Sequence, residues 1–271
     1  MEMELFSLSE GDAPLIISVP HAGIFVPEEI KNRFTAEGRE LADTDWHVPL
    51  LYQDYAAKHN VTMIAANYSR YVIDLNRPSD DTPLYPGQKK VPLCPDMTFE
   101  DKPVYDDGQA PAKDEIAERI TAYWQPYHDE LARQIERVKS LHGYAVLYDA
   151  HSIAQELPSL FNGKLPDINI GTAAGKSCGA GIGEAALAEA KKSNYSTILN
   201  GRFIGGYITR HYGDPAHDVH AVQMELVRKN YMDEDGFKYR EDLAANLIPV
   251  LERVLDTVAD NARAGIHTKT V

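Results

Sequence analysis

The chain has 271 residues, of which 44% are hydrophobic and 25% are charged, and its formal net charge is −14. This length and hydrophobic content suffice for one large domain with a buried core. The negative charge disfavours binding to nucleic acid or to an anionic membrane surface, because both would repel the protein.

Strands and a helix are expected in the first part of the chain. Short hydrophobic runs predict buried strands over residues 15–19, 61–66 and 71–74. Apolar residues at helical spacing predict a helix that begins near Val48. Residues 78–111 are dense in Pro, Asp and Gly, and they predict a long irregular segment of a kind that often carries function.

The second part of the chain alternates helices with strands. A long helix is expected over residues 116–138, with Asp114 as its cap and a kink at Pro126. A carboxy-terminal helix is expected over residues 243–258, ending before Gly265. Further buried strands are predicted over residues 144–148, 168–171 and 221–226. This alternation favours an α/β fold.

The sequence also bears on location and domain number. No segment approaches the roughly 18 apolar residues that span a bilayer, and residues 1–15 lack the basic and apolar stretches of a secretory signal. Cys94 and Cys178 lie outside any C-x-x-C pattern, which predicts reduced thiols. We therefore expect a cytoplasmic protein with a single domain over residues 1–271, and the oligomeric state stays open.

Two histidines directly follow predicted buried strands: His21 in Ser-Val-Pro-His21-Ala-Gly, and His151 in Asp-Ala-His151-Ser. Ligands of open α/β sheets bind beyond the carboxyl ends of the strands, where both imidazoles should project. Two such histidines can share one divalent metal ion, and the alternative is that each is a hydrogen-bonded loop residue.

Three other histidines lie on predicted helices or beyond their ends, and we expect them to face solvent: His59, His128 and His142.

A catalytic zinc site normally has a third protein ligand and an open position for water. The candidates are Asp45, the pair Glu28 and Glu29, and His47. We prefer Asp45 because it lies in a short polar cluster beside Trp46, whereas Glu28 and Glu29 resemble an exposed helix start. The alternative role for Asp45 is to cap the following helix.

Glu225 stands in a predicted strand that is otherwise mostly apolar, Ala-Val-Gln-Met-Glu225-Leu. Such a carboxylate lies either on a solvated face or inside a site. Beside an activated water it is suited to act as general base and then to protonate a departing amine. Burial would raise its pKa toward the range that this task requires.

Arginines are concentrated where an anion could bind. Arg70 and Arg77 flank one predicted strand, and each can form a fork of hydrogen bonds to a carboxylate, with Asn76 as an amide donor. Arg210 and His211 lie in a glycine-flanked segment that, taken alone, indicates a surface hairpin. In so acidic a chain, three arginines near one candidate site favour a small anionic substrate.

The candidate residues lie in an ordered set of segments: Ser-Val-Pro-His21-Ala-Gly, Thr44-Asp45-Trp46, Ser69-Arg70, Asp74-Leu75-Asn76-Arg77-Pro78, Asp149-Ala-His151-Ser152, Gly206-Tyr-Ile-Thr-Arg210-His211-Tyr-Gly213 and Gln223-Met-Glu225-Leu. This set, over roughly residues 12–260, resembles the N-formylglutamate amidohydrolase family. The family is similar to zinc carboxypeptidases and aspartoacylases. The resemblance therefore implies a three-layer α/β/α fold with a central mixed β-sheet, of the phosphorylase/hydrolase-like type.

The resemblance implies metal-dependent hydrolysis of N-formyl-L-glutamate to formate and L-glutamate, as in one route of histidine degradation. The implied roles are metal ligation by His21 and His151, activation of water by Glu225, polarisation of the scissile carbonyl by Arg70, and binding of a substrate carboxylate by Asn76 and Arg77. Zn²⁺ is the expected ion, and Co²⁺, Mn²⁺ and Fe²⁺ stay open because nitrogen and oxygen ligands suit several metals.

One departure from the related enzymes concerns the third ligand. Their first two ligands come from a His-x-x-Glu pattern, and this chain has Ile24 where the acid would stand, which favours Asp45. Because formylglutamate carries two carboxylates, Arg77 and Arg210 are the expected cationic anchors. The alternatives are an amidohydrolase or carboxypeptidase for another N-acyl amino acid, and a non-catalytic protein that binds an acidic metabolite.

Overall fold

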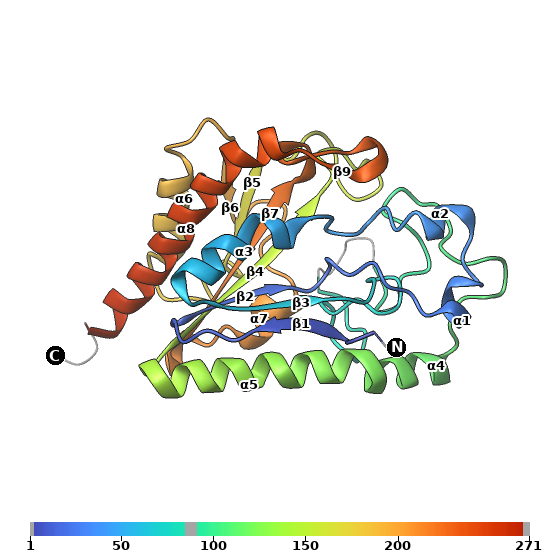
Figure 1. Cartoon of the computed structure of the whole chain (residues 1–271), viewed down its shortest axis with the longest axis horizontal. Helices are drawn as coiled ribbons and strands as arrows, with labels where there is room; N and C mark the ends of the chain where they lie inside the picture. The colour runs from blue at the N-terminus through green and yellow to red at the C-terminus, as the bar shows by residue number, and fades with distance from the viewer. Residues whose placement is uncertain (1–2, 85–90, 268–271) are drawn as a thin grey trace.

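A mixed β-sheet forms the centre of the structure, a computed structural model that describes residues 3–84 and 91–267 (Figure 1). Its strands are β1 (Phe6–Ser9), β2 (Leu15–Val19), β3 (Thr62–Ala66), β4 (Ala145–Ile153), β5 (Ile168–Gly171), β6 (Thr197–Leu199) and β7 (Val219–Val227). Their order is β1-β3-β2-β4-β7-β5-β6. Strands β3, β2, β4 and β7 are parallel, β1 pairs antiparallel with β3, and β5 pairs antiparallel with β7 and parallel with β6. A separate hairpin joins β8 (Met232–Asp233) to β9 (Lys238–Tyr239).

Helices cover both faces of this sheet. The helical segments of the structure are α1 (Glu28–Lys31), α2 (Ala36–Arg39), α3 (Val48–His59), α4 (Lys113–Arg119), α5 (Gln125–His142), α6 (Ile182–Ala190), α7 (Tyr207–Tyr212) and α8 (Glu241–His267), with a π-helix η1 (Ile120–Trp124) and 3-10 turns at Pro215–His217, Arg228–Asn230 and Asp235–Phe237. Helices α3, α6 and α8 pack on one face, and α5 and α7 pack on the other (Figure 1). The predicted three-layer α/β/α fold with a mixed sheet is confirmed.

Strand β2 illustrates why these residues form buried strands. Leu15, Ile17 and Val19 belong to the core shared with α3 and α8, whereas Ile16 belongs to the core shared with α5. Successive side chains of a strand point to opposite faces, so a strand covered on both sides needs an unbroken apolar run. The strands predicted over residues 15–19, 61–66, 144–148, 168–171 and 221–226 correspond to β2, β3, β4, β5 and β7.

The strand predicted over residues 71–74 is wrong. Its apolar side chains are buried, but the segment forms turns in which the Val72 amide donates to the Ser69 carbonyl. The Asp74 amide donates to the Leu93 carbonyl, far along the chain. A short apolar run indicates burial without fixing the backbone conformation, and here tertiary contacts selected a loop.

The long helix predicted over residues 116–138 is interrupted, as expected from Pro126. The π-helix η1 lies between α4 and α5, and Pro126 is the second residue of α5. The backbone stays helical through Trp124, so the missing N–H of Pro126 removes one hydrogen bond at the point where the hydrogen-bond pattern of the helix changes. The predicted capping role of Asp114 is wrong, because Ala112 is the N-cap and Asp114 lies in the first turn of α4.

The predicted end of the carboxy-terminal helix is also wrong. Helix α8 continues to His267 and includes Gly265. A single glycine costs a helix only about 1 kcal/mol, and the apolar face of α8 packs against α6 and α3.

Among the described residues, no helix is both long and apolar enough to cross a bilayer.

Candidate active site

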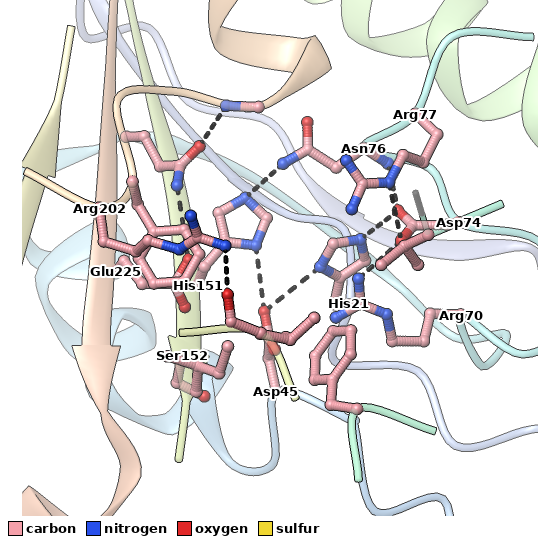
Figure 2. Close-up of a pocket in the computed structure, with 17 residues that line it drawn as sticks. His21, Asp45, Arg70, Asp74, Asn76, Arg77, His151, Ser152, Arg202 and Glu225 are labelled. Carbon is pink, nitrogen blue, oxygen red and sulfur yellow. Dashed lines mark hydrogen bonds and ion pairs between the residues drawn. The ribbon is translucent and has the colours of Figure 1, made fainter. Parts of the chain in front are cut away.

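The carboxyl ends of three parallel strands bring the main candidates together. His21 follows β2, His151 lies near the end of β4, and Glu225 lies near the end of β7 (Figure 2). His151 and Glu225 are partners in the β4–β7 register, so the sheet itself sets their separation. All three side chains are buried and line one cavity.

Asp45 reaches the two histidines from the loop before α3. Its backbone amide donates to the His21 carbonyl at 2.9 Å, which ties the loop to the end of β2. Its Oδ2 atom lies 3.1 Å from Nδ1 of His151 and 3.5 Å from Nδ1 of His21. The N-cap of α3 is His47, so Asp45 does not cap the helix. The ligand atoms of His21, Asp45 and His151 lie within 4.8 Å of one another.

The other nitrogen of each histidine meets a second carboxylate. Nε2 of His21 lies 2.7 Å from Oδ1 of Asp74, and Nε2 of His151 lies 3.1 Å from Oδ2 of Asp149. Metal-binding histidines usually have such a partner behind the ring, because it fixes the ring orientation and makes the ligating nitrogen more basic. Two imidazoles and one carboxylate are also the donors of many hydrolytic metal sites. The residues present therefore fit a divalent cation.

Glu28 and Glu29 do not join this group. They are exposed at the start of α1, as the sequence predicts. His47 directs Nε2 to the Phe237 carbonyl at 2.8 Å. Among the described residues, Asp45 is the acidic side chain that the structure groups with the two histidines as a candidate metal site.

The pKa values of the buried carboxylates in the site are shifted by burial and by neighbouring charged groups. Burial raises the pKa of Asp45, but hydrogen bonds with His151 and His21 outweigh burial and hold the net pKa below its usual range. Burial acts on Asp74 in the same sense, and the nearby guanidinium of Arg70 brings its pKa well below the usual value. Both carboxylates are therefore ionised and able to accept hydrogen bonds or bind a cation.

Glu225 differs from these carboxylates because no arginine or histidine bonds to it directly in the described part of the chain. It is 7% exposed, and burial raises its pKa to about 8. The Gln223 side-chain amide donates to Oε2 of Glu225 at 3.4 Å. Oε1 of Gln223 accepts in turn from the Gly206 amide at 2.6 Å. A carboxylate with a pKa near neutrality is suited to accept and return a proton.

Arg70 lies at the edge of the group, fixed by several contacts. Its Nη2 donates to Oδ2 of Asp74 at 2.6 Å, and its guanidinium carbon lies 4.7 Å from the ring centre of Phe99. Its buried Nε has no hydrogen-bond partner among the described residues. The Arg70 guanidinium is therefore fixed in the cavity wall, and its Nε can still donate a hydrogen bond.

Asn76 and Arg77 line the same cavity. The Asn76 amide nitrogen lies 3.0 Å from Nε2 of His151, and its Oδ1 accepts from the Ile208 amide at the start of α7 at 2.8 Å. Arg77 Nε lies 3.9 Å from Oδ2 of Asp74. Helix α7 thus fixes the amide of Asn76 beside a candidate metal ligand.

Two predicted substrate residues do not reach the cavity formed by the described residues. Arg210 donates to the carbonyls of Gly205 and Leu84, and exposed His211 stacks on Tyr207. The expected surface hairpin is in fact helix α7, and neither side chain is among the described residues that line the cavity.

Sequence reasoning assigned no role to Asp74, Asp149, Gln223 or Arg202. The first two lie behind the histidines, and the last two line the cavity. A signal existed for Asp149, because residues two apart on a strand share a face and His151 follows at that spacing. Nothing in the local pattern distinguishes Arg202.

The fold and this site together define a hydrolytic enzyme with a candidate metal centre at the carboxyl edge of its sheet. A model of the N-formylglutamate amidohydrolase family matches residues 13–232. The chain belongs to this family. N-formylglutamate deformylases of Pseudomonas putida and Pseudomonas aeruginosa are each 46% identical to it, across 94% of this chain and 96% of theirs.

Two solved structures share the fold of this chain. The crystal structure of an N-formylglutamate amidohydrolase from Ralstonia eutropha JMP134 is 27% identical, with a TM-score of 0.82 over 97% of this chain and 100% of that chain. A gene product of Agrobacterium tumefaciens is 17% identical, with a TM-score of 0.72 over 98% of this chain and 97% of that one, and shares the fold.

Proposed function

We propose that this protein hydrolyses N-formyl-L-glutamate to formate and L-glutamate with the help of a divalent cation held by His21, Asp45 and His151. The observation that carries the proposal is the convergence of these three buried ligands beside the buried carboxylate of Glu225. The substrate is inferred from the deformylases that are 46% identical over nearly the whole chain.

Each protein group has a defined part in this reaction. A bound cation supplies positive charge that polarises the formyl oxygen and lowers the pKa of water. Glu225 accepts a proton from the attacking water as the new carbon–oxygen bond forms. The carbon–nitrogen bond then breaks, and Glu225 returns the proton to the departing amine nitrogen of glutamate.

Arg70 is proposed to stabilise the negative charge that develops on the formyl oxygen. Its guanidinium is already fixed by Asp74 and Phe99, so little reorganisation is needed when the charge appears. Asn76 and Arg77 are proposed to bind a carboxylate of the substrate, since both line the cavity beside the histidines. Arg210 and His211 do not line this cavity and have no part in the proposed mode of binding.

The identity of the metal ion and the cellular location of the protein are also proposed. Zn²⁺ is the proposed ion, because two imidazoles and one carboxylate leave a position open in its tetrahedral coordination. Co²⁺, Mn²⁺ and Fe²⁺ accept similar donors and are compared in the experiment below. The buried free thiols of Cys94 and Cys178 support a reducing, cytoplasmic location, and the enzyme is proposed to be a single domain.

The first experiment measures formate release from N-formyl-L-glutamate by chelated protein and by protein loaded with each of the four ions. N-acetyl-L-glutamate is tested in parallel. We expect metal-dependent release of formate and at least ten-fold slower cleavage of the acetyl compound, because an extra methyl group must fit beside the metal ligands. Faster cleavage of the acetyl compound would instead indicate an amidohydrolase for larger acyl groups, and no cleavage under any condition would refute the proposal.

A further inference from the structure

Arg202 lies in the wall of the active-site cavity, a few residues after β6. In the view of Figure 2, both candidate metal histidines lie between Arg202 and Arg70. Its Nη2 donates to the Leu160 carbonyl at 2.6 Å, and its guanidinium carbon lies 5.9 Å from the ring centre of Phe161. The side chain is therefore held in place by a loop outside the sheet.

This guanidinium carries charge that the described residues do not neutralise. Its buried Nε has no hydrogen-bond partner, and Arg202 forms no ion pair with a described carboxylate. Arg70 and Arg77, in contrast, both lie next to Asp74. A partly buried cation without a counter-ion is costly, and an anionic ligand that pairs with it removes the cost.

Two residues on one side of the cavity lie close to the candidate metal ligands. Asn76 contacts the candidate metal ligand His151, and Arg77 lies beside Asp74, which bonds to His21. The α-carboxylate of an N-formyl amino acid is attached to the carbon that bears the amide, so it must stay close to that group. The side-chain carboxylate of glutamate extends two methylene groups farther.

We infer that Arg202 binds the side-chain carboxylate of the substrate, on the cavity wall away from Asn76 and Arg77, and thereby selects glutamate. This inference rests on the proposed function. The apolar side chains of Leu160 and Phe203 line the cavity on the Arg202 side, where they can contact the methylene groups of the substrate. Asn76 and Arg77 then hold the α-carboxylate.

The test compares two formyl substrates that differ only in side-chain charge, N-formyl-L-glutamate and N-formyl-L-glutamine. In Arg202→Met we expect kcat/KM for the glutamate compound to fall about 100-fold or more, the loss typical of a charge pair with one partner removed. For the glutamine compound we expect a change below about three-fold, because it lacks the charge that Arg202 would pair with.

Two further variants separate this role from a structural one. Arg202→Lys keeps the cation but loses the planar fork, so activity on the glutamate compound should lie between those of wild type and Arg202→Met. Arg253→Met removes an exposed arginine on α8 and should change neither substrate. Thermal unfolding of each variant shows whether it folds.

The outcomes distinguish failure of the inference from failure of the proposed function. If wild type releases no formate from either compound, the proposed function is wrong. If wild type cleaves N-formyl-L-glutamate but the Arg202 variants lose both substrates equally, or lose neither, Arg202 does not read the side chain. Selective loss of the glutamate compound in Arg202→Met, with partial recovery in Arg202→Lys, supports the inference.

Discussion

Glu225 and Asp45 are both buried carboxylates of one site, yet their surroundings shift their pKa values in opposite directions. Hydrogen bonds with two histidines keep Asp45 ionised despite its burial, whereas burial dominates at Glu225 and raises its pKa to about 8. A ligand should remain charged, and a general base should exchange a proton near neutral pH. The contrast therefore assigns different tasks to two side chains of the same type.

We predict that Glu225→Gln folds and binds metal but loses activity by a factor of about 10²–10⁴, since a glutamine amide cannot accept the water proton. Formate release under saturating metal measures the activity, and elemental analysis measures bound metal. Glu28→Gln, at an exposed position on α1, is the matched control and should keep full activity. Normal turnover by Glu225→Gln would remove this residue as the base.

At the scale of elements, helical segments on two sides fix the loop that carries Asn76 and Arg77. On one side, η1 and α5 hold its backbone: Trp124 Nε1 donates to the Arg77 carbonyl at 2.9 Å, and His128 Nε2 donates to the Leu75 carbonyl at 2.9 Å. The expectation that His128 faces solvent is wrong. Burial lowers its pKa to about 3, so the ring is neutral and can donate from one nitrogen only.

On the other side, the start of α7 holds the Asn76 side chain. The Ile208 amide donates to its Oδ1, and the backbone of Gly206 passes directly beside its amide group. A Cβ atom at Gly206 would lie 2.3 Å from the Asn76 amide nitrogen. Glycine is therefore required here for close approach of the two segments.

We predict that Gly206→Ala raises KM for N-formyl-L-glutamate about ten-fold or more, because the displaced Asn76 loses its contact with His151 and its place in the cavity. Steady-state kinetics and thermal unfolding measure the effect. Gly265→Ala is the control, since a Cβ there meets no atom within 4 Å; it should keep the kinetics and add up to about 1 kcal/mol to the stability of α8. An unchanged KM in Gly206→Ala would show that Asn76 does not contribute to substrate binding.

At the scale of the whole molecule, the proposed metal would join segments that lie far apart in the sequence. His21 follows β2, Asp45 precedes α3, and His151 is 106 residues beyond Asp45 on β4. These residues come together only in the folded chain. An ion that binds them stabilises the folded state, by about 2.7 kcal/mol when its concentration is 100 times its dissociation constant.

We predict that Zn²⁺ at this concentration raises the melting temperature by several degrees, and that a chelator reverses the change. In His21→Ala and His151→Ala the increment should disappear and bound zinc should fall in elemental analysis. His59→Ala, in an exposed histidine that stacks on Tyr55, should keep both properties of the wild type. Full zinc occupancy in both ligand variants would contradict the proposed site.

The sequence by itself determined which strands are buried and which residues stand at their carboxyl ends. Apolar runs marked β2 and the first part of β4, because side chains on both faces of these strands lie in the core. His21 and His151 were visible because each follows closely after such a run. Asp45 and Glu225 were candidates because of their local sequence, and the segments that resemble a known family include both of them.

Only the tertiary structure decided which side chains from distant segments meet in the cavity. It placed Asp74 behind His21, kept Arg210 out of the cavity lining, and brought Arg202 into it. Local sequence periodicity reports burial and backbone conformation. The direction of a long side chain instead depends on hydrogen-bond partners contributed by distant segments, such as the Leu160 carbonyl that holds Arg202.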